Sequence, residues 1–254
     1  ADIGSIKIRD LEEWYNNYYS PSNAIVIIAG DINFSESREL VEKYYGKVQD
    51  KKVVKYVNKI NHTPSLEDIL VSDKVSQPII LMSYKNKPFN NNNKKEMYTL
   101  ELLFELMDGS NSSRFTRNLI DEKKIAISTF ISYDTYSARE NLITMGGSPR
   151  KGVAPSVFKK ELLNEFVEFI DNGLMEGELE QVKSRLLANN IYKFDSVFYQ
   201  VMQVGMLETK NHNWELLDNY INDVNAITED DLKTVAKKVI LDNKFLYSLI
   251  RPKL

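Results

Sequence analysis

The residue types that most often do chemistry are scarce in this chain. Its 254 residues include two histidines, His62 and His212, and no cysteine. Histidine and cysteine are the commonest zinc ligands, and histidine is the usual general base near neutral pH. Neither histidine has a second histidine or a cysteine at ligand spacing. The sequence therefore predicts two ordinary surface histidines and no metal ligand in this chain.

A second candidate is the segment Gly109–Arg117, which places small residues and two arginines at a predicted helix start. Such a start could hold an anion, because main-chain N–H groups point outward there. The segment has no glycine pattern typical of a phosphate loop, and its serines do not form Gly-x-Ser-x-Gly. We therefore expect a loop between two helices with exposed arginines. Gly30-Asp31, after an apolar run, is expected to be a turn.

Composition excludes several function classes. The chain is 43% hydrophobic and 27% charged, which is typical of a globular protein, and its net charge is -3. It has no basic excess for binding nucleic acid or an anionic membrane. No apolar run approaches a membrane span, and no signal peptide is visible at the first residues. Because the chain has no cysteine, its sequence does not indicate whether the protein works in an oxidising or a reducing compartment.

Apolar periodicity predicts many helices and several short strands. The helices are expected at 8–19, 35–46, 96–107, 112–122, 156–171, 177–194, 196–208, 213–223 and from 228 onward. The strands are expected at 24–29, 70–71, 79–84, 125–133, 141–145 and 245–250. Thr228 and Asp231 resemble a capping box, and Tyr15, Tyr18 and Tyr19 are expected in a core. Because two strands are consecutive, this order favours an α+β fold, with helices packed on a mixed, largely antiparallel sheet.

Two stretches of the chain echo each other. Asp10-Leu11 begins a helix that leads to Asn23 and the predicted strand 24–29, and Asp231-Leu232 begins one that leads to Asn243 and a final strand. Such an echo indicates the ends of two related units. We expect residues 1–50 to be the C-terminal end of a truncated first domain, 51–66 a linker, and 67–254 a complete second domain.

Four segments, in order along the chain, carry a family resemblance. The first segment runs from Tyr18-Tyr19-Ser20-Pro21-Ser22-Asn23-Ala24 through an apolar run to Gly30-Asp31. The second runs from Gly109 to Leu119 and includes Ser113-Arg114. The third is Gly173 with Glu178-Leu179, and the fourth is Asp195-Ser196 followed by Ile227 to Asp231. Met175 stands where the family pattern has a threonine. Together these segments resemble the pitrilysin/insulinase family of zinc metallopeptidases, in its short branch similar to the mitochondrial processing peptidase.

The resemblance implies a LuxS/MPP-like architecture of two related domains that close over a peptide. The family's first domain carries His-x-x-Glu-His and a downstream glutamate, which bind zinc and activate a water. That motif is absent from this sequence. The resemblance therefore implies zinc in a longer parent protein and none in this chain, which would be inactive alone. It leaves the compartment open, and a periplasmic or secreted location would suit a bacterial parent.

The resemblance also addresses substrate binding. Family partners that hold the substrate have Arg-x6-Tyr, and the corresponding positions here are Ile120 and Ile127. Isoleucine cannot donate a hydrogen bond to a substrate carbonyl or an oxyanion. The resemblance thus implies a peptide substrate reached through the parent, and a companion subunit of the same fold that supplies the arginine and the tyrosine. A scaffold subunit without chemistry, or an α+β module for another ligand, remains open.

Overall fold

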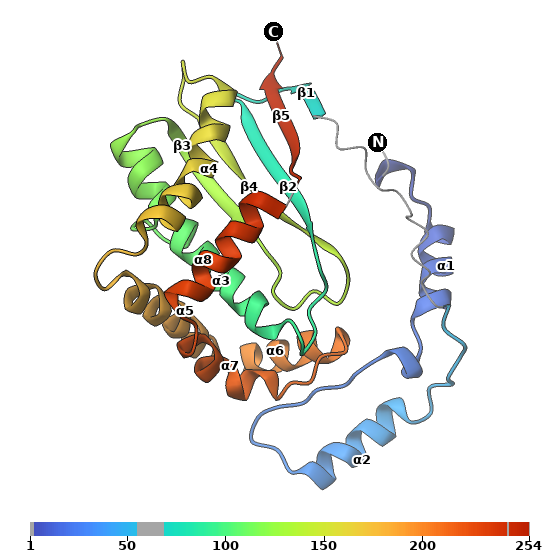
Figure 1. Cartoon of the computed structure of the whole chain (residues 1–254). Coiled ribbons are helices and arrows are strands. Elements are labelled where there is room, and N and C mark those ends of the chain that lie inside the picture. Colours follow the sequence, from blue (N-terminus) through green and yellow to red (C-terminus); the bar gives the residue numbers. More distant parts are fainter. Residues whose placement is uncertain (1–2, 55–68, 243, 254) are drawn as a thin grey trace. The chain divides into compact units, whose positions relative to one another are not determined.

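The computed structural model describes residues 3–54, 69–242 and 244–253 (Figure 1). The chain divides into two compact units. Unit 1 comprises Ala1–Thr63 and Lys193–Thr209, and unit 2 comprises Pro64–Tyr192 and Lys210–Leu254. None of the described helices is both long enough and apolar enough to cross a bilayer.

Unit 2 contains a mixed five-stranded sheet with the strand order β1-β5-β2-β4-β3. The strands are β1 (Ile69–Asp73), β2 (Ile79–Asn86), β3 (Ala126–Ser132), β4 (Asn141–Pro149) and β5 (Leu246–Pro252). The pairing of β1 with β5 is parallel, and the other three pairings are antiparallel. The largely antiparallel α+β fold predicted from the sequence is confirmed.

Helices cover one face of this sheet, as Figure 1 shows for α3 (Lys94–Asp108), α4 (Pro155–Asn172) and α8 (Glu229–Lys237). The hydrophobic core lies between these helices and the sheet. Alternate residues of β2, such as Ile80 and Met82, are fully buried there. This alternation follows from the two-residue period of a strand, which sends successive side chains to opposite faces.

The remaining helical segments of unit 2 lie around this core. They are the π-helical η3 (Phe115–Glu122) and η4 (Lys238–Asp242), α5 (Glu178–Phe194), which runs on into unit 1, and α7 (Leu216–Asn225). The predicted capping box is confirmed at the start of α8. The Thr228 side chain accepts from the Asp231 N–H, and the Asp231 carboxylate accepts from the Thr228 N–H.

Unit 1 contains α1 (Ile8–Tyr18), α2 (Phe34–Tyr45), α6 (Val197–Thr209) and two short 3-10 helices, Ile3–Ser5 and Pro21–Asn23. Two predictions about it were wrong. Residues 24–29 form no strand, because the described part of unit 1 offers no neighbouring strand for their main-chain groups. Tyr15 and Tyr19 are 57% and 56% exposed and stack on each other, and Tyr18 is partly buried, so these tyrosines are not a core.

The start of α2 also differs from the prediction. Asn33 rather than Ser35 caps this helix, because its side-chain oxygen accepts from the Ser35 and Glu36 N–H groups. Most of the predicted linker, residues 55–66 with His62, lies outside the described residues.

Candidate functional site

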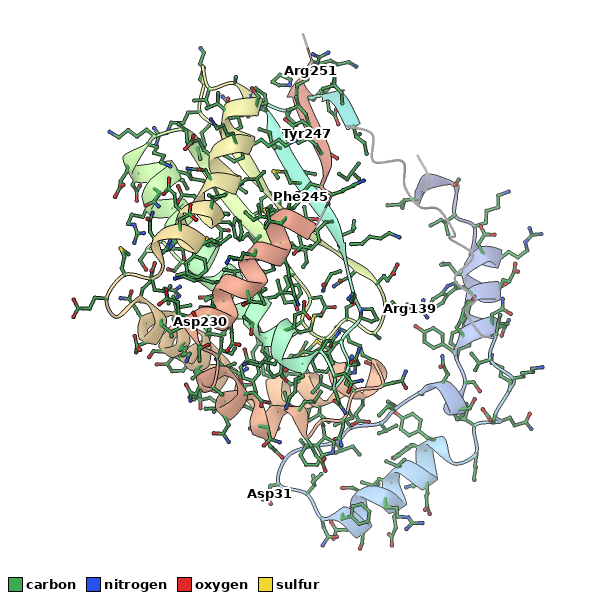
Figure 2. All side chains as sticks on the ribbon, viewed as in Figure 1. Asp31, Arg139, Asp230, Phe245, Tyr247 and Arg251 are labelled. Atoms are coloured by element: carbon green, nitrogen blue, oxygen red, sulfur yellow. The ribbon has the colours of Figure 1, made fainter. Side chains whose placement is uncertain are left out.

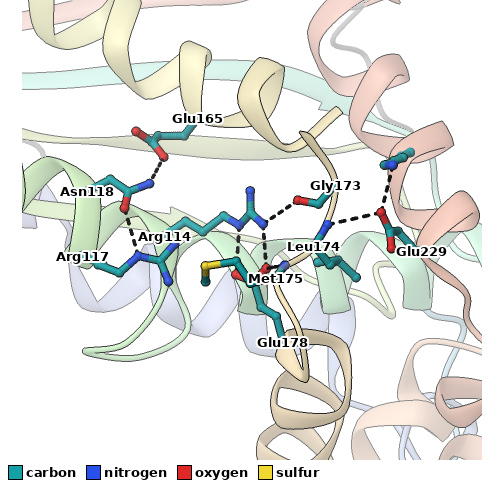
Figure 3. A network of polar contacts seen from close by, with 10 residues as sticks. Arg114, Arg117, Asn118, Glu165, Gly173, Leu174, Met175, Glu178 and Glu229 are labelled. Carbon is teal, nitrogen blue, oxygen red and sulfur yellow. Dashed lines mark hydrogen bonds and ion pairs between the residues drawn. The ribbon is translucent and has the colours of Figure 1, made fainter. Parts of the chain in front are cut away.

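The segment that follows α3 makes a tight serine-rich turn. The Ser113 hydroxyl accepts from the Ser110 N–H at 2.8 Å and donates to the Glu105 carbonyl at 3.2 Å. This turn ends α3 and starts η3 in a new direction. As a result Arg114, the residue just before η3, points into the interior between helices (Figure 3).

Arg114 and Glu178 form a buried, two-pronged ion pair. The Arg114 Nε and Nη2 atoms lie 3.0 Å and 2.6 Å from the two carboxylate oxygens of Glu178. Nη2 also donates to the Gly173 carbonyl at 2.9 Å, and the guanidinium lies over the Phe169 ring. The two residues are only 6% and 7% exposed. A planar guanidinium suits this geometry because its donors match both carboxylate oxygens at once.

Opposing effects set the charge state of Glu178. Burial alone would raise the pKa of this carboxyl, since it disfavours the charged form. Hydrogen bonds from Arg114 and from the Met175 N–H outweigh burial and lower the pKa below its ordinary value. Glu178 is also the first residue of α5, where the helix dipole favours a negative charge. Glu178 is therefore ionised at neutral pH.

Further polar contacts extend this network (Figure 3). Asn118 of η3 donates to Glu165 of α4, which is 1% exposed and also accepts from Lys123 at 2.9 Å. On the other side, the Leu174 N–H donates to Glu229 of α8 at 3.2 Å. The network thus ties η3 to α4, to the start of α5 and to α8.

This arrangement corrects the prediction of exposed arginines. Arg114 is buried, and its guanidinium is already engaged by a carboxylate and a carbonyl, so it is not available to an anion. Arg117 is partly exposed and donates to Asn118. The sequence signal for Arg114 was weak, because Glu178 lies 64 residues away and only the fold brings the two together.

The histidine prediction also needs a correction. His212 is partly buried, its ring packs edge-on against Phe89 at 5.0 Å, and its Nε2 lies 3.1 Å from the Tyr136 carbonyl oxygen. It belongs to an aromatic cluster and is not an ordinary surface histidine. His62 lies outside the described residues. Within the described part of the chain, no group of three or more His, Cys, Asp or Glu side chains could hold a metal ion.

The two isoleucines predicted at substrate-binding positions lie on neighbouring elements. Ile120 is in η3 and packs against the core, while Ile127 is in the edge strand β3 and is 49% exposed. Their side chains are apolar and donate no hydrogen bond. Their equivalence to an Arg-x6-Tyr pair stays a prediction.

Comparison with known proteins relates the chain to a peptidase family. A model described as the peptidase M16 inactive domain matches residues 5–186. The zinc protease PqqE of Helicobacter pylori is 25% identical over 201 residues, which cover 77% of this chain and 44% of that protein. The uncharacterized zinc protease YmxG of Bacillus subtilis is 22% identical over 252 residues, which cover 98% of this chain and 59% of that protein. The chain thus spans about half the length of these relatives.

A solved structure supports the same assignment at the level of fold. The crystal structure of a protease from Helicobacter pylori matches with a TM-score of 0.80 and 19% identity, over 100% of this chain and 60% of that chain. These findings confirm the resemblance predicted from the sequence. Because the family model covers more than half of its residues, this chain belongs to the peptidase M16 family, where it matches the part described as the inactive domain.

Proposed function

We propose that this chain is the C-terminal region of a zinc-dependent endopeptidase subunit, and that it is inactive alone. The observation that carries the proposal is the match to the peptidase M16 inactive domain, together with two longer relatives named zinc proteases. The zinc ligands would belong to another part of the parent, since this sequence has no His-x-x-Glu-His. Zinc there would polarise a water for attack on a peptide bond.

We propose that unit 1 is part of a larger domain of the parent protein. We propose residues 1–50 as the end of a first domain, 51–66 as a linker and 67–254 as a complete second domain. Ile25, Val26 and Ile28 are each about half exposed, and an open hollow of about 630 Å³ beside them is lined largely by apolar side chains, Phe34 among them. Exposed apolar surface of this extent is typical of a face that another element covers.

In the longer parent protein, unit 2 would form part of the wall of the peptide chamber and part of the interface with a companion subunit. A closed chamber needs rigid walls that exclude water from the peptide, and the helix-covered sheet with its buried network would supply one. A companion subunit of the same fold would supply the arginine and tyrosine, because Ile120 and Ile127 cannot donate hydrogen bonds. The substrates would be peptides, since both curated relatives are named proteases.

The test begins with the roughly 150 codons upstream of Ala1, a length that follows from the internal echo. If they encode His-x-x-Glu-His with a downstream glutamate, the longer protein should bind one zinc and, with its companion, cleave a quenched fluorescent peptide. Replacing the first histidine of that motif by alanine should abolish both. A longer protein that has the motif and its companion but neither binds zinc nor cleaves peptides would refute the proposal.

The second candidate is a scaffold subunit of the same fold without chemistry. Ile120 and Ile127 have no side-chain hydrogen-bond donor. This favours a scaffold without chemistry as much as it favours a peptidase that depends on a companion subunit. An upstream region that lacks the zinc motif, in a protein that still assembles with a partner, would support the scaffold and exclude the peptidase.

A further inference from the structure

A cavity at the end of α3 gathers three acidic side chains. Glu101, Glu105 and Asp108 are spaced four and three residues apart, so they lie on one face of this helix. All three line a pocket of about 180 Å³ between α3 and the end of β3, among the side chains of unit 2 that are drawn in Figure 2. Each of the three is partly buried. Carboxylates that converge on one cavity favour a positively charged ligand.

Asp108 keeps its negative charge without a cationic partner. Among the described residues, no lysine or arginine lines this pocket. Arg185 reaches Glu105 from α5, with its Nε atom 2.7 Å from the carboxylate. Asp108 instead accepts from the Thr129 hydroxyl at 2.5 Å and from the Ile131 N–H, and both of these donors are uncharged. Within the described part of the chain, a cationic ligand would therefore be the first positive charge to pair with Asp108.

The surroundings of Asp108 disfavour its charged form. Burial and the nearby Glu105 raise the pKa of the Asp108 carboxyl above its ordinary value, against the effect of its two hydrogen bonds. Burial and the Glu101 carboxylate also raise the pKa of Tyr133, which lines the same pocket. Glu101 thus adds negative charge on this side of α3. A cation bound here would offset the repulsion between these carboxylates.

Thr135 provides a hydrogen-bond acceptor that is not in use. Its side chain lines the pocket and is only 9% exposed. Its hydroxyl forms no hydrogen bond with any of the described residues. Buried polar groups of native proteins are normally hydrogen-bonded, so an exception inside a pocket points to a ligand. The hydroxyl oxygen can accept from an N–H of that ligand.

The remaining walls are apolar and suit a short alkyl chain. Phe104 and Tyr133 pack edge-on at 5.4 Å, and Ile131 lines the same cavity. A volume of about 180 Å³ is roughly six times that of one water in the liquid, which is enough for about five heavy atoms. The acidic residues described do not form a group of three that could hold a metal ion. A primary ammonium suits them better, because its three donors can reach separate acceptors.

We propose that this pocket binds a primary alkylammonium group, which pairs with the Asp108 carboxylate and donates to the Thr135 hydroxyl. The alkyl chain of the ligand packs against Phe104 and Ile131, and the aromatic ring adds to the attraction of the cation. A free amine and the lysine side chain of a protein present the same group. The site is independent of the proposed peptidase role, because it involves neither zinc nor residues 120 and 127.

The probe is n-butylammonium chloride, titrated into the whole ¹⁵N-labelled chain while the amide signals of residues 109 and 135 are followed by NMR. The dissociation constant should be on the order of 1 mM, as expected for a ligand of so few atoms. The matched control 1-butanol has the same number of heavy atoms and no charge, and should bind about tenfold more weakly. Sodium chloride at equal concentration controls for ionic strength.

Three variants locate the binding. Asp108→Asn removes the charge and keeps the shape, so it should weaken binding of n-butylammonium about tenfold. Asp121→Asn is the matched control, since Asp121 is exposed and lies outside the pocket lining, and it should change binding less than about twofold. Thr135→Val should weaken binding about threefold without lowering the urea midpoint, because the hydroxyl that it removes has no partner.

Three results would each overturn the proposal. They are equal binding of n-butylammonium and 1-butanol, equal effects of Asp108→Asn and Asp121→Asn, and unaltered binding by Thr135→Val. In the unaltered chain, n-butylammonium should also lower the pKa of the Asp108 carboxyl, followed by ¹³C NMR, because a nearby positive charge favours the ionised form. An unchanged pKa would count against the proposal in the same way.

A second ligand identifies the source of the ammonium group. Nα-acetyl-lysine N-methylamide carries the same group on a peptide-like main chain. If it binds at least as tightly as n-butylammonium, the pocket accepts a lysine side chain of a protein. If it binds about tenfold more weakly, because its main chain meets the rim of the pocket, the ligand is a free amine.

Discussion

The buried ion pair between Arg114 and Glu178 provides the sharpest test of how unit 2 is held together. In Arg114→Met, the Glu178 carboxylate keeps the hydrogen bond from the Met175 N–H but loses both bonds from the guanidinium. The Gly173 carbonyl also loses the donor that Arg114 supplies. Removing one partner of a buried pair costs about 3–5 kcal/mol, because the remaining charge stays buried and uncompensated. We expect a loss of that size in the free energy of unfolding of unit 2.

A double replacement separates the pair's own contribution from the cost of an orphaned charge. Arg114→Met with Glu178→Met leaves no charge behind, and replacing both members of a buried pair by apolar residues is often nearly neutral. The double variant should therefore be more stable than Arg114→Met by about 2 kcal/mol or more. Glu140→Gln is the matched control, because its pair with Lys85 is exposed and should contribute less than about 1 kcal/mol.

Urea unfolding with a single fluorescent reporter measures these differences in unit 2. The chain has two tryptophans, Trp14 in unit 1 and Trp214 in unit 2. In a Trp14→Phe background, Trp214 alone reports on unit 2. A loss below about 1 kcal/mol for Arg114→Met, no larger than that of Glu140→Gln, would refute the reasoning, because it would place the pair among exposed ones.

The same pair predicts a pH dependence with a definite sign. Because the pKa of Glu178 is lower in the folded chain than its ordinary value of 4.5, its stabilisation is present above pH 4.5. It is lost as the pH falls through the lowered folded-state pKa, where the carboxylate becomes protonated. The stability difference between the unaltered chain and Glu178→Gln should therefore shrink below pH 4.5 and stay constant between pH 6 and 8.

Three further predictions concern other parts of the chain. Gly146→Ala should destabilise unit 2 by about 2–3 kcal/mol in urea unfolding, because the added Cβ would overlap the Ile80 carbonyl on the neighbouring strand; an unchanged midpoint would contradict this. Thr228→Ala should cost about 1 kcal/mol through loss of the α8 cap. The chain alone should bind no stoichiometric zinc at micromolar metal and cleave no peptide. Stoichiometric zinc found by elemental analysis, and lost when His62 or His212 is replaced, would overturn this prediction.

Local patterns were sufficient for several elements of unit 2. The apolar periodicity of 96–107 and 156–171 predicted α3 and α4 within two residues at each end. The apolar stretch 79–84 predicted β2, and the Thr228–Asp231 pattern predicted the cap of α8. These elements could be predicted because each one buries its own apolar face against a core within the same unit.

Prediction was wrong where the outcome depends on distant residues. Residues 24–29 have the composition of a buried strand, but a strand needs a neighbour whose main chain it can pair with. Arg114 was expected at the surface because its partner is far along the chain, and His212 because Phe89 and Tyr136 are equally remote. The sequence contains these residues, but only the fold determines which of them meet.

The contrast between the two units bears on the proposed role. Unit 2 buries aromatic and aliphatic side chains completely, whereas the described helices α1 and α2 of unit 1 contain no buried residue. Apolar burial contributes roughly 25 cal/mol for each Å² removed from water. The half-exposed side chains of Ile25, Val26 and Ile28 therefore leave a sizeable free energy unrealised, which a covering element would recover. A strand from the rest of a longer parent, pairing with 24–29, would both bury these side chains and supply the missing main-chain partners. Under the proposed domain division, the remainder of a first domain in the parent would both cover the exposed face of unit 1 and carry the zinc motif that this sequence lacks.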